Sequence, residues 1–413
     1  MLPRATRPIL LLVCALLASA LGSARAADDA PPSEALRWNE RGLALTDERR
    51  HAAAVDAFRR ARAAAPDDAT IRRNLALAHS NLAVALLAEG DVEPAARHAE
   101  QALELQPDDP VVVLNVAACH DERGHPARAA ALVRRARRIG LGVAHVHERM
   151  AAVLYREGDL KGAIEEWRLA AVLEPGNDSV REKLARARRS AEAEARLTPQ
   201  LSAHFEVLHD AAGAVLASLV LRELEDAYRV VTADLQQAPD GPVKVVLLST
   251  EEFRSTTGTS TWVAGLYDGR IRLPVKGVSD RAALLARARH EYVHAALAPL
   301  GRRAPSWLHE GLAQIHEGRP VEAARARLAR TAAVPFDDLT GSFATTQAEA
   351  RARLQYDTAL AFVAWLRGGE RGSRFSIAMR RLFEDAALAV AFDDGYGAAL
   401  ADLYTSFQAS VAR

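Results

Sequence analysis

Cysteine is nearly absent from this sequence: the chain of 413 residues has two, Cys14 and Cys119. Cys14 lies in an apolar segment near the start, where we expect it to be removed with a signal peptide. Cys119 would then remain alone, so no intramolecular disulfide can form. Because Cys119 lies on the apolar face of a predicted helix, we expect a small buried hydrophobic side chain rather than a nucleophile.

The sequence also has no excess of charge of either sign. Lys plus Arg and Asp plus Glu number 53 each, and aromatic residues make up only 5%. Since no basic patch with interleaved aromatics is present, nucleic acid is not an expected partner. No apolar run after the first 26 residues is long enough to cross a bilayer, so we expect no transmembrane anchor in the mature chain. The roughly 390 residues that remain suffice for two or three domains with their own cores.

The first 26 residues have the pattern of a secretory signal peptide. Arg4 and Arg7 give a basic start, and residues 9–21 form an apolar run that is short for a membrane span. Residues 24–26, Ala-Arg-Ala, provide a cleavage site of the small-x-small type. An uncleaved N-terminal anchor is the alternative interpretation. We expect cleavage after Ala26 and export, either to the periplasm or out of the cell.

Residues 35–197 are rich in Ala, Leu and Arg and contain an internal repeat. Small residues recur every 34 positions on two successive helices, and proline closes two of the units. The repeated positions are Ala83, Ala117 and Ala151; Ala95, Ala129 and Ala163; Ala99, Val133 and Trp167; Ala102, Ala136 and Ala170; and the prolines Pro107 and Pro175. The period of 34 predicts stacked pairs of helices.

An earlier unit fits the same template at an offset of 41 instead of 34. Its positions are Gly42, Ala54, Phe58, Ala61 and Pro66. The difference predicts about two extra helical turns, which we place in the helix at 74–87. Residues 178–196 are highly charged and predict a helix that caps the array towards solvent. A short coiled coil is the alternative for that helix.

This pattern of small and bulky positions resembles the tetratricopeptide repeat over roughly four units, although the third has Leu141 where proline is usual. The resemblance implies an all-α solenoid whose concave groove binds peptide segments or partner proteins. A rigid spacer that only holds the next domain is the alternative, because a fold does not fix a function.

A second domain is expected at 198–413, where strand patterning replaces the repeat. The predicted elements are a strand at 204–208, an amphipathic helix through 216–228, a buried strand at 243–248 and a hairpin at 262–275 that turns at Asp268-Gly269. Ser279 and Asp280 then cap a long helix that breaks at 299–305, where a second helix begins. The order predicts a sheet followed by two helices that bring the candidate site together.

The segment 290–294 (HEYVH) places two imidazoles one helical turn apart with a carboxylate between them. Because positions i and i+4 share a helix face, His290 and His294 can reach one metal ion while Glu291 faces its open side. This arrangement provides two zinc ligands and a general base for zinc-activated water. Two surface histidines on a charged helix are the alternative when the pentapeptide is taken alone. Glu310, sixteen residues beyond His294, is the natural third ligand.

HEYVH followed by WLHEGLA at 307–313 resembles the gluzincin zinc metallopeptidases. The wider arrangement, with a hairpin before the active helix, is similar to bacterial peptidase MA-like domains and covers most of 205–407. The resemblance implies a zincin-like α+β domain and one zinc ion per chain.

By the same resemblance, His290, His294 and Glu310 bind the zinc ion and Glu291 is the catalytic base. The family commonly has Asn before the ligand Glu, where this chain has His309. Adjacent helical residues diverge by about 100°. We therefore expect His309 to face a neighbouring side chain rather than to bind the metal in place of Glu310.

Tyr356 is a further candidate, because residues 355–357 resemble the helix start Y-x-[KQ]-[GS] of related aminopeptidases. There the tyrosine hydroxyl stabilises the oxyanion as water attacks the carbonyl. This chain departs from that pattern with Thr358 and Ala359. We expect Tyr356 to open the helix through 358–366. A buried helix-start tyrosine without a catalytic role is the alternative.

The hairpin also bears on substrate binding, because residues 263–266 would form an exposed strand edge to which an extended peptide can add. An ordinary structural hairpin is the alternative. The sequence has no segment like Gly-x-Met-Glu-Asn to capture a free amino terminus, which favours an endopeptidase over an aminopeptidase.

The sequence thus supports an exported zinc metallopeptidase that acts on proteins or peptides and carries an N-terminal repeat array. One alternative is a non-catalytic interaction scaffold whose peptidase-like domain keeps zinc. Another is a binding module in which the HExxH motif is accidental and no metal is bound. The intact ligands and base favour the enzyme over the scaffold.

Overall fold

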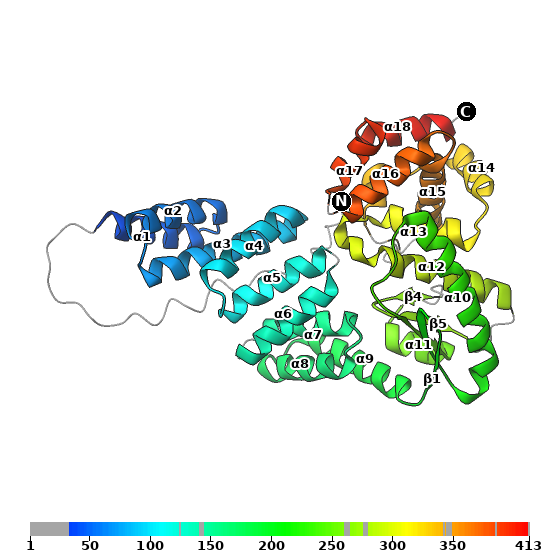
Figure 1. The fold of residues 1–413 in the computed structure, drawn as a ribbon, viewed down its shortest axis with the longest axis horizontal. Helices are drawn as coiled ribbons and strands as arrows, with labels where there is room; N and C mark the ends of the chain where they lie inside the picture. Colours follow the sequence, from blue (N-terminus) through cyan, green and yellow to red (C-terminus); the bar gives the residue numbers. More distant parts are fainter. Residues whose placement is uncertain are drawn as a thin grey trace. The chain divides into compact units, whose positions relative to one another are not determined.

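The computed structural model describes residues 33–123, 125–139, 144–259, 265–275, 280–341, 343, 349–384 and 386–411. The expected signal peptide with Cys14, Leu141, Ser279 and the hairpin residues 262–264 lie outside the described residues. The chain splits into two compact units, one made of residues 1–122 and 127–142 and the other of residues 123–126 and 143–413, and Figure 1 shows their elements. Across the described ranges, every helix is either too short or too polar to span a membrane.

The first unit consists of paired helices. They are α1 (Glu34–Asp47), α2 (His51–Ala64), α3 (Ala69–Glu89), α4 (Val92–Leu105), α5 (Pro110–Glu122) and α6 (Pro126–Ile139). Successive helices from α1 to α5 pack on one another. The small positions of the repeat lie at these contacts, since Ala61, Ala83, Ala95 and Ala102 are 0% exposed. Cys119 is also buried. The helical array predicted from the 34-residue period is confirmed.

Helix α3 has 21 residues, whereas α1 has 14 and α5 has 13. This difference confirms the two extra turns predicted from the offset between repeat units. The helix begins at Asp68, whose side chain accepts hydrogen bonds from the amides of Thr70 and Ile71, and it ends at Gly90 with a φ of 92°. Its first half packs into the core with α2, and its second half packs into the core with α4.

The second unit begins with α7 (Ala144–Arg156), α8 (Leu160–Leu173) and α9 (Asp178–Glu194). The charged helix predicted at 178–196 is α9, but it does not cap the array towards solvent, because it packs on α8 and on α11 (Thr250–Thr257), and Ala193 shares a core with the sheet. Strands begin at Thr198, but the contacts group α7–α9 with the sheet. Whether 35–197 and 198–413 fold as separate domains therefore stays a prediction.

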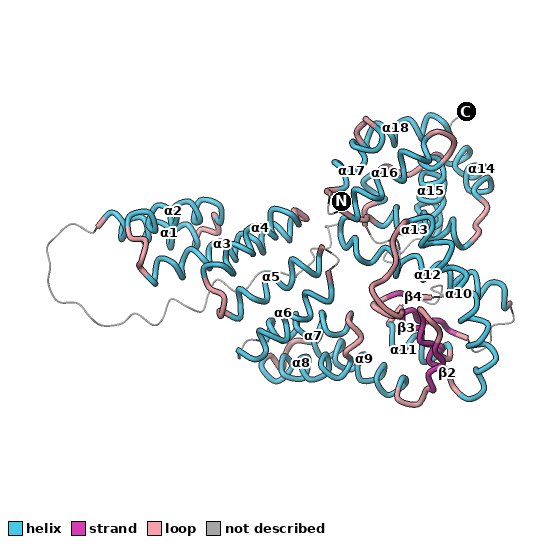
Figure 2. The backbone as a smooth tube through the Cα atoms, in the orientation of Figure 1, coloured by secondary structure: helices cyan, strands magenta, loops and turns pink. Residues whose placement is uncertain are grey.

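A five-stranded mixed sheet follows, drawn in magenta in Figure 2. Its strands are β1 (Thr198–Leu201), β2 (Phe205–His209), β3 (Val243–Leu248), β4 (Leu266–Tyr267) and β5 (Ile271–Pro274), in the order β1-β2-β3-β5-β4. The central strands β2, β3 and β5 are parallel, and the edge strands β1 and β4 are antiparallel to their neighbours. The predicted strands at 204–208 and 243–248 are confirmed within one residue.

Strand β1 was not predicted, because the first strand was expected at 204–208 and residues 197–199 only as the boundary between the two domains. Pro199 lacks an amide hydrogen, but an edge strand tolerates this loss because one of its sides has no partner strand. The hairpin turn at Asp268-Gly269 is confirmed, and Gly269 has a φ of 97°.

Alternate residues of the central strands face two helical layers. Val245 and Leu247 belong to the large core with α10 (Ala214–Leu235) and α12 (Arg281–Leu297). Val246 and Leu248 face the other way and pack with Phe253 of α11. Because side chains alternate along a strand, β3 is buried on both faces, which explains its unbroken apolar sequence.

The remaining helices pack beyond α12. They are α13 (Ser306–Glu317), α14 (Val321–Thr331), α15 (Glu349–Arg367), α16 (Arg371–Phe383), α17 (Leu388–Tyr396) and α18 (Leu400–Val411). The break predicted at 299–305 is a 3-10 helix, Ala298–Arg303, followed by Pro305 at the start of α13. The expected helix start at Tyr356 is wrong, because α15 begins at Glu349. Residues 350–354 (ARARL) are strong helix formers, and Ala352 is buried against neighbouring elements.

Two arginines are buried where the hairpin meets α7 and α9. Arg270 donates hydrogen bonds to Glu194 Oε1 and to the Tyr155 carbonyl, both at 2.8 Å. Arg272 donates to Tyr155 Oη at 2.8 Å and to Asp268 Oδ1 at 3.2 Å. Both arginines are 0% exposed, so each buried charge depends on these partners.

Replacing Glu194 with alanine is therefore expected to destabilise the second unit strongly. The Arg270 guanidinium would stay buried without its counter-ion, at a cost of about 3 kcal/mol. Glu182→Ala on the same helix is the control, because the Glu182 side chain is 70% exposed in its ion pair with Arg186. This variant should lower the free energy of unfolding by less than about 0.5 kcal/mol. Urea unfolding followed by circular dichroism measures both. Equal losses of stability in the two variants would contradict the role given to the buried pair.

Candidate metal centre

Helix α12 carries His290, Glu291 and His294 on its buried side. It starts at Asp280, whose side chain accepts a hydrogen bond from the Ala283 amide at 3.0 Å. The rings of His290 and His294 lie 5.0 Å apart, centre to centre, as expected one turn apart on one helix face.

Helix α13 carries Glu310 and is held against α15 by the residues around it. Trp307 is fully buried, with its ring 5.0 Å from that of Phe362. A Cβ on Gly311 would lie 2.4 Å from Val363 Cγ2, so glycine permits the close approach of α13 and α15. The Trp and Gly of the WLHEGLA segment thus position Glu310 towards α12.

The structure brings the three predicted ligands together. Glu310 Oε2 lies 3.4 Å from His290 Nε2, and Glu310 Oε1 lies 3.7 Å from His294 Nε2. One nitrogen from each histidine and one carboxylate oxygen all lie within 4.8 Å of one another. Two imidazoles and one carboxylate with room for a further ligand are the donor set of a catalytic zinc site. That they bind metal stays a prediction.

One buried oxygen of this cluster tests whether the residues fit a metal ion. Among the described residues Glu310 Oε2 has no hydrogen-bond partner, because the His290 nitrogen 3.4 Å away is outside good hydrogen-bond geometry. A buried carboxylate oxygen without a donor is costly. A metal ion between the three side chains would satisfy it, so the residues present fit zinc.

The second nitrogen of each histidine has a protein partner. Glu317 Oε2 lies 3.1 Å from His290 Nδ1, and His309 Nδ1 lies 3.3 Å from His294 Nδ1. Such outer partners orient a histidine so that Nε2 points at the metal. His309 thus faces His294, as expected. The contact of Glu317 with His290 was not predicted from the sequence. Its spacing was a signal, since it lies seven residues after Glu310 on the same helix face.

The charges in the cluster suit its expected chemistry. Burial raises the pKa of Glu291 to about 7, a value suited to a general base near neutral pH. Burial also raises the pKa of Glu310, but the neighbouring imidazoles outweigh it and hold this pKa at about 2. Burial lowers the pKa of His290, whereas Glu310 and Glu317 raise it to about 9. The two carboxylates therefore favour a positive charge at His290, whether a proton or a metal ion.

Tyr356 lies near this cluster, within α15. Burial raises its pKa, and the negative charge of Glu310 raises it further, so the phenol stays protonated. Gln314 Nε2 donates to the carbonyls of both Glu310 and Tyr356, at 3.1 and 3.0 Å, and so joins the two segments. Among the described side chains, the Tyr356 hydroxyl has no hydrogen-bond partner.

The edge strand β4 begins against the candidate base. A Cβ on Gly265 would lie 2.6 Å from Glu291 Oε1 and 3.0 Å from Arg287 Cδ, so only glycine lets the strand approach this closely. Of the expected substrate-aligning segment 263–266, residues 263 and 264 lie outside the described part of the chain. The described part places Gly265 directly beside Glu291.

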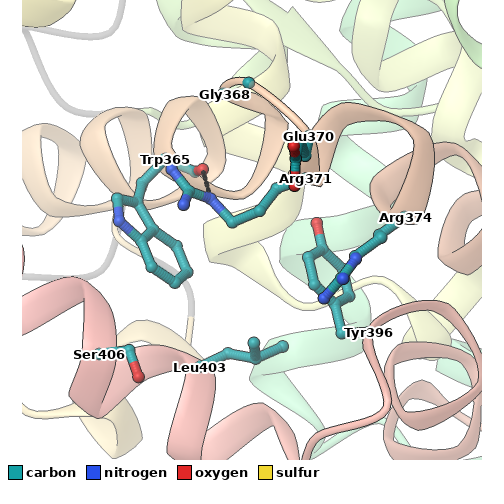
Figure 3. A pocket seen from close by; sticks show the side chains of 9 residues that line it. Trp365, Gly368, Glu370, Arg371, Arg374, Tyr396, Leu403 and Ser406 are labelled. Atoms are coloured by element: carbon teal, nitrogen blue, oxygen red, sulfur yellow. Dashed lines mark hydrogen bonds between the residues drawn. The ribbon is translucent and has the colours of Figure 1, made fainter.

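A separate cavity of about 630 Å³ lies among α15–α18 and is shown in Figure 3. Its lining includes Trp365, Arg371, Arg374, Tyr396 and Leu403. Arg371 is stacked 4.2 Å from the centre of the Trp365 ring and donates to the Trp365 carbonyl at 2.7 Å. None of the three candidate metal ligands lines this cavity, and its residues form no metal-binding cluster. The candidate site therefore stays with α12 and α13.

Comparisons with known proteins concern the repeats. A family model described as tetratricopeptide repeat matches residues 86–153, so the chain contains tetratricopeptide repeats in its helical array. No curated protein matches the chain.

Several solved structures are similar to the chain. MamA of AMB-1 is 19% identical over 38% of this chain and 89% of that protein, with a TM-score of 0.30. PilF of Pseudomonas aeruginosa is 18% identical over 38% of this chain and 85% of that protein, with a TM-score of 0.29. The TPR domain of P58(IPK) is 14% identical over 85% of this chain and 79% of that domain, with a TM-score of 0.26. At these TM-scores, the similarities carry no argument about function.

Proposed function

We propose that this chain is an exported zinc metallopeptidase of the gluzincin type, with tetratricopeptide repeats that bind a protein or peptide. The observation that carries the proposal is the convergence of His290, His294 and Glu310 within 4.8 Å. The buried Glu291 lies on the same helix as the two histidines. Any one of these groups alone would be unremarkable, but together they match the needs of metal-assisted hydrolysis.

The chain's own residues would divide the reaction between them. A zinc ion at the site would supply Lewis-acid activation of a water molecule and of the substrate carbonyl. Glu291 accepts the proton of the attacking water and then delivers it to the leaving amine. The Tyr356 hydroxyl donates a hydrogen bond to the oxyanion that develops on the carbonyl oxygen.

Substrate would bind as an added strand along β4. This strand is at the edge of the sheet, so one side of its backbone has no partner strand in the described sheet. An extended peptide paired there would pass Gly265 and reach Glu291, which favours cleavage within a chain. The repeats support the proposed binding of a protein partner, and the basic, apolar and small-residue pattern of residues 1–26 supports export.

The proposal predicts about one zinc ion per chain, because the donor set is that of a single catalytic site. Elemental analysis of the mature protein, purified without chelator, measures this. Cleavage of casein should stop with a zinc chelator and return when zinc is added. Protein that holds no zinc and takes up none would refute the enzyme. Zinc without cleavage, together with partner capture by the repeats, would favour the non-catalytic scaffold.

A further inference from the structure

Arg287 is a charged residue at the candidate site that the proposed mechanism does not use. It lies on α12, one helical turn before Glu291. Its guanidinium is 3.7 Å from Glu317 Oε1, and its side chain is 25% exposed. In the described part of the chain this ion pair is its one direct polar contact, and it makes no hydrogen bond there.

One oxygen of Glu317 already has two other partners. Its Oε2 atom lies 3.1 Å from His290 Nδ1 and accepts a hydrogen bond from Arg319 Nε at 3.1 Å. Arg287 faces the other oxygen, Oε1, at 3.7 Å, which is beyond hydrogen-bond distance, so its five N–H donors are available. The side chain is mostly buried and its donors are unused within the described part of the chain, so the guanidinium can take an acceptor from a bound molecule.

Arg287 lies beside the candidate catalytic base, Glu291. The Gly265 backbone covers the Cγ and Cδ atoms of Arg287 together with Glu291 Oε1. The side-chain stem is thus enclosed between α12 and the start of β4, while the head stays partly open.

We propose that Arg287 binds a carboxylate of the substrate, so that the enzyme prefers peptides with an acidic group close to the scissile bond. This inference rests on the proposed function. A guanidinium binds a carboxylate through two parallel hydrogen bonds, which gives both affinity and orientation. The carboxylate belongs either to the free C-terminus of a peptide or to an Asp or Glu side chain, and the experiment separates these sources.

Without the Arg287 guanidinium, the carboxylates of the site would repel an acidic peptide. Glu291, Glu310 and Glu317 all lie around the candidate centre. Arg287 lies beside Gly265, where β4 begins, and offsets part of this negative charge there. Its binding partner is therefore expected next to the edge strand, where an added peptide would run.

The test uses the full-length zinc-loaded protein with Glu291→Gln, so that peptides bind but are not cleaved. Fluorescence anisotropy measures the Kd of one labelled hexapeptide with a free or an amidated C-terminus, and of versions with Glu exchanged for Gln at each position. At least one carboxylate should tighten binding by about tenfold. Adding Arg287→Gln should remove that preference and leave the neutral peptide unchanged.

Arg289→Gln in the same background is the matched control. Arg289 lies on the same helix but pairs with Glu223 of α10 at 3.0 Å. It should keep the carboxylate preference. A preference for the free C-terminus would assign the carboxylate to the chain end, and a Glu-over-Gln preference would assign it to a side chain.

Failure of this inference is distinguishable from failure of the proposed function. Equal Kd values for all peptide versions would overturn the role of Arg287 while leaving the peptidase intact. Loss of zinc or uniform weakening of all peptides with Arg287→Gln would also overturn it, in favour of a structural contact with Glu317. If the zinc-loaded protein bound no peptide at all, the proposed function would fail and this inference with it.

Discussion

Glu291→Gln is expected to abolish peptide hydrolysis while zinc stays bound. The change keeps the size of a side chain that is only 4% exposed and packed beside Gly265, so fold and metal ligands should persist. It removes the group that accepts the proton of the attacking water, and kcat should fall by about a thousandfold. Turnover of a fluorogenic peptide and elemental analysis of the same sample measure the two halves of the expectation.

Two further variants serve as a control for this result and as a test of Tyr356. Glu223→Gln on α10 changes a carboxylate outside the site and should leave turnover unchanged. Tyr356→Phe should lower kcat with a smaller effect on KM, because the hydroxyl would act on the oxyanion that forms during the reaction. Cleavage by Glu291→Gln at the parent rate would assign the hydrolysis to a contaminant or to another site.

Glu310→Ala is expected to lose most of the bound zinc. The three ligand atoms converge within 4.8 Å, and removing the carboxylate leaves two imidazoles without the charge that balances the metal. Zinc affinity should fall by more than the roughly 10- to 100-fold that follows from changing an outer partner. Competition with a chromophoric chelator measures this affinity.

His309→Ala is the matched comparison, on the adjacent residue of the same helix. His309 contacts His294 Nδ1 at 3.3 Å and would orient that ligand without binding the metal. It should keep one zinc ion per chain with at most a modest loss of affinity. The reverse pattern, with zinc lost from His309→Ala and kept by Glu310→Ala, would show that His309 is the third ligand.

The features that could be predicted from the sequence are those with a period or a fixed local spacing. The 34-residue repeat predicts the paired helices, its offset of 41 predicts the longer α3, and an unbroken apolar run predicts the buried strand β3. Each of these features follows from the order of residues along one segment of the chain. The convergence of His290, His294 and Glu310 also follows from local rules, because a helical turn and a break between two helices set it. Glycine at 311 then lets α13 pack closely enough.

What escaped prediction depends on contacts between distant segments. Strand β1 exists because it pairs with β2, although its Thr-Pro sequence suggests a linker. The start of α15 depends on the burial of Ala352. Glu317 contacts His290 because it lies in the last turn of α13. Arg287 lies beside the candidate base because β4 approaches α12. The HExxH motif contains neither signal.

The length of α3 also limits how such an array can grow. Seven added residues rotate a helix by about 700°, roughly 20° short of two full turns. Positions on either side of such an insertion therefore keep facing the same partners, and the helix gains about 10 Å of length. Five added residues would instead rotate the second half by about 140° and turn Ala83 away from α4. Duplications or deletions within these helices can persist only when they span close to a whole number of turns.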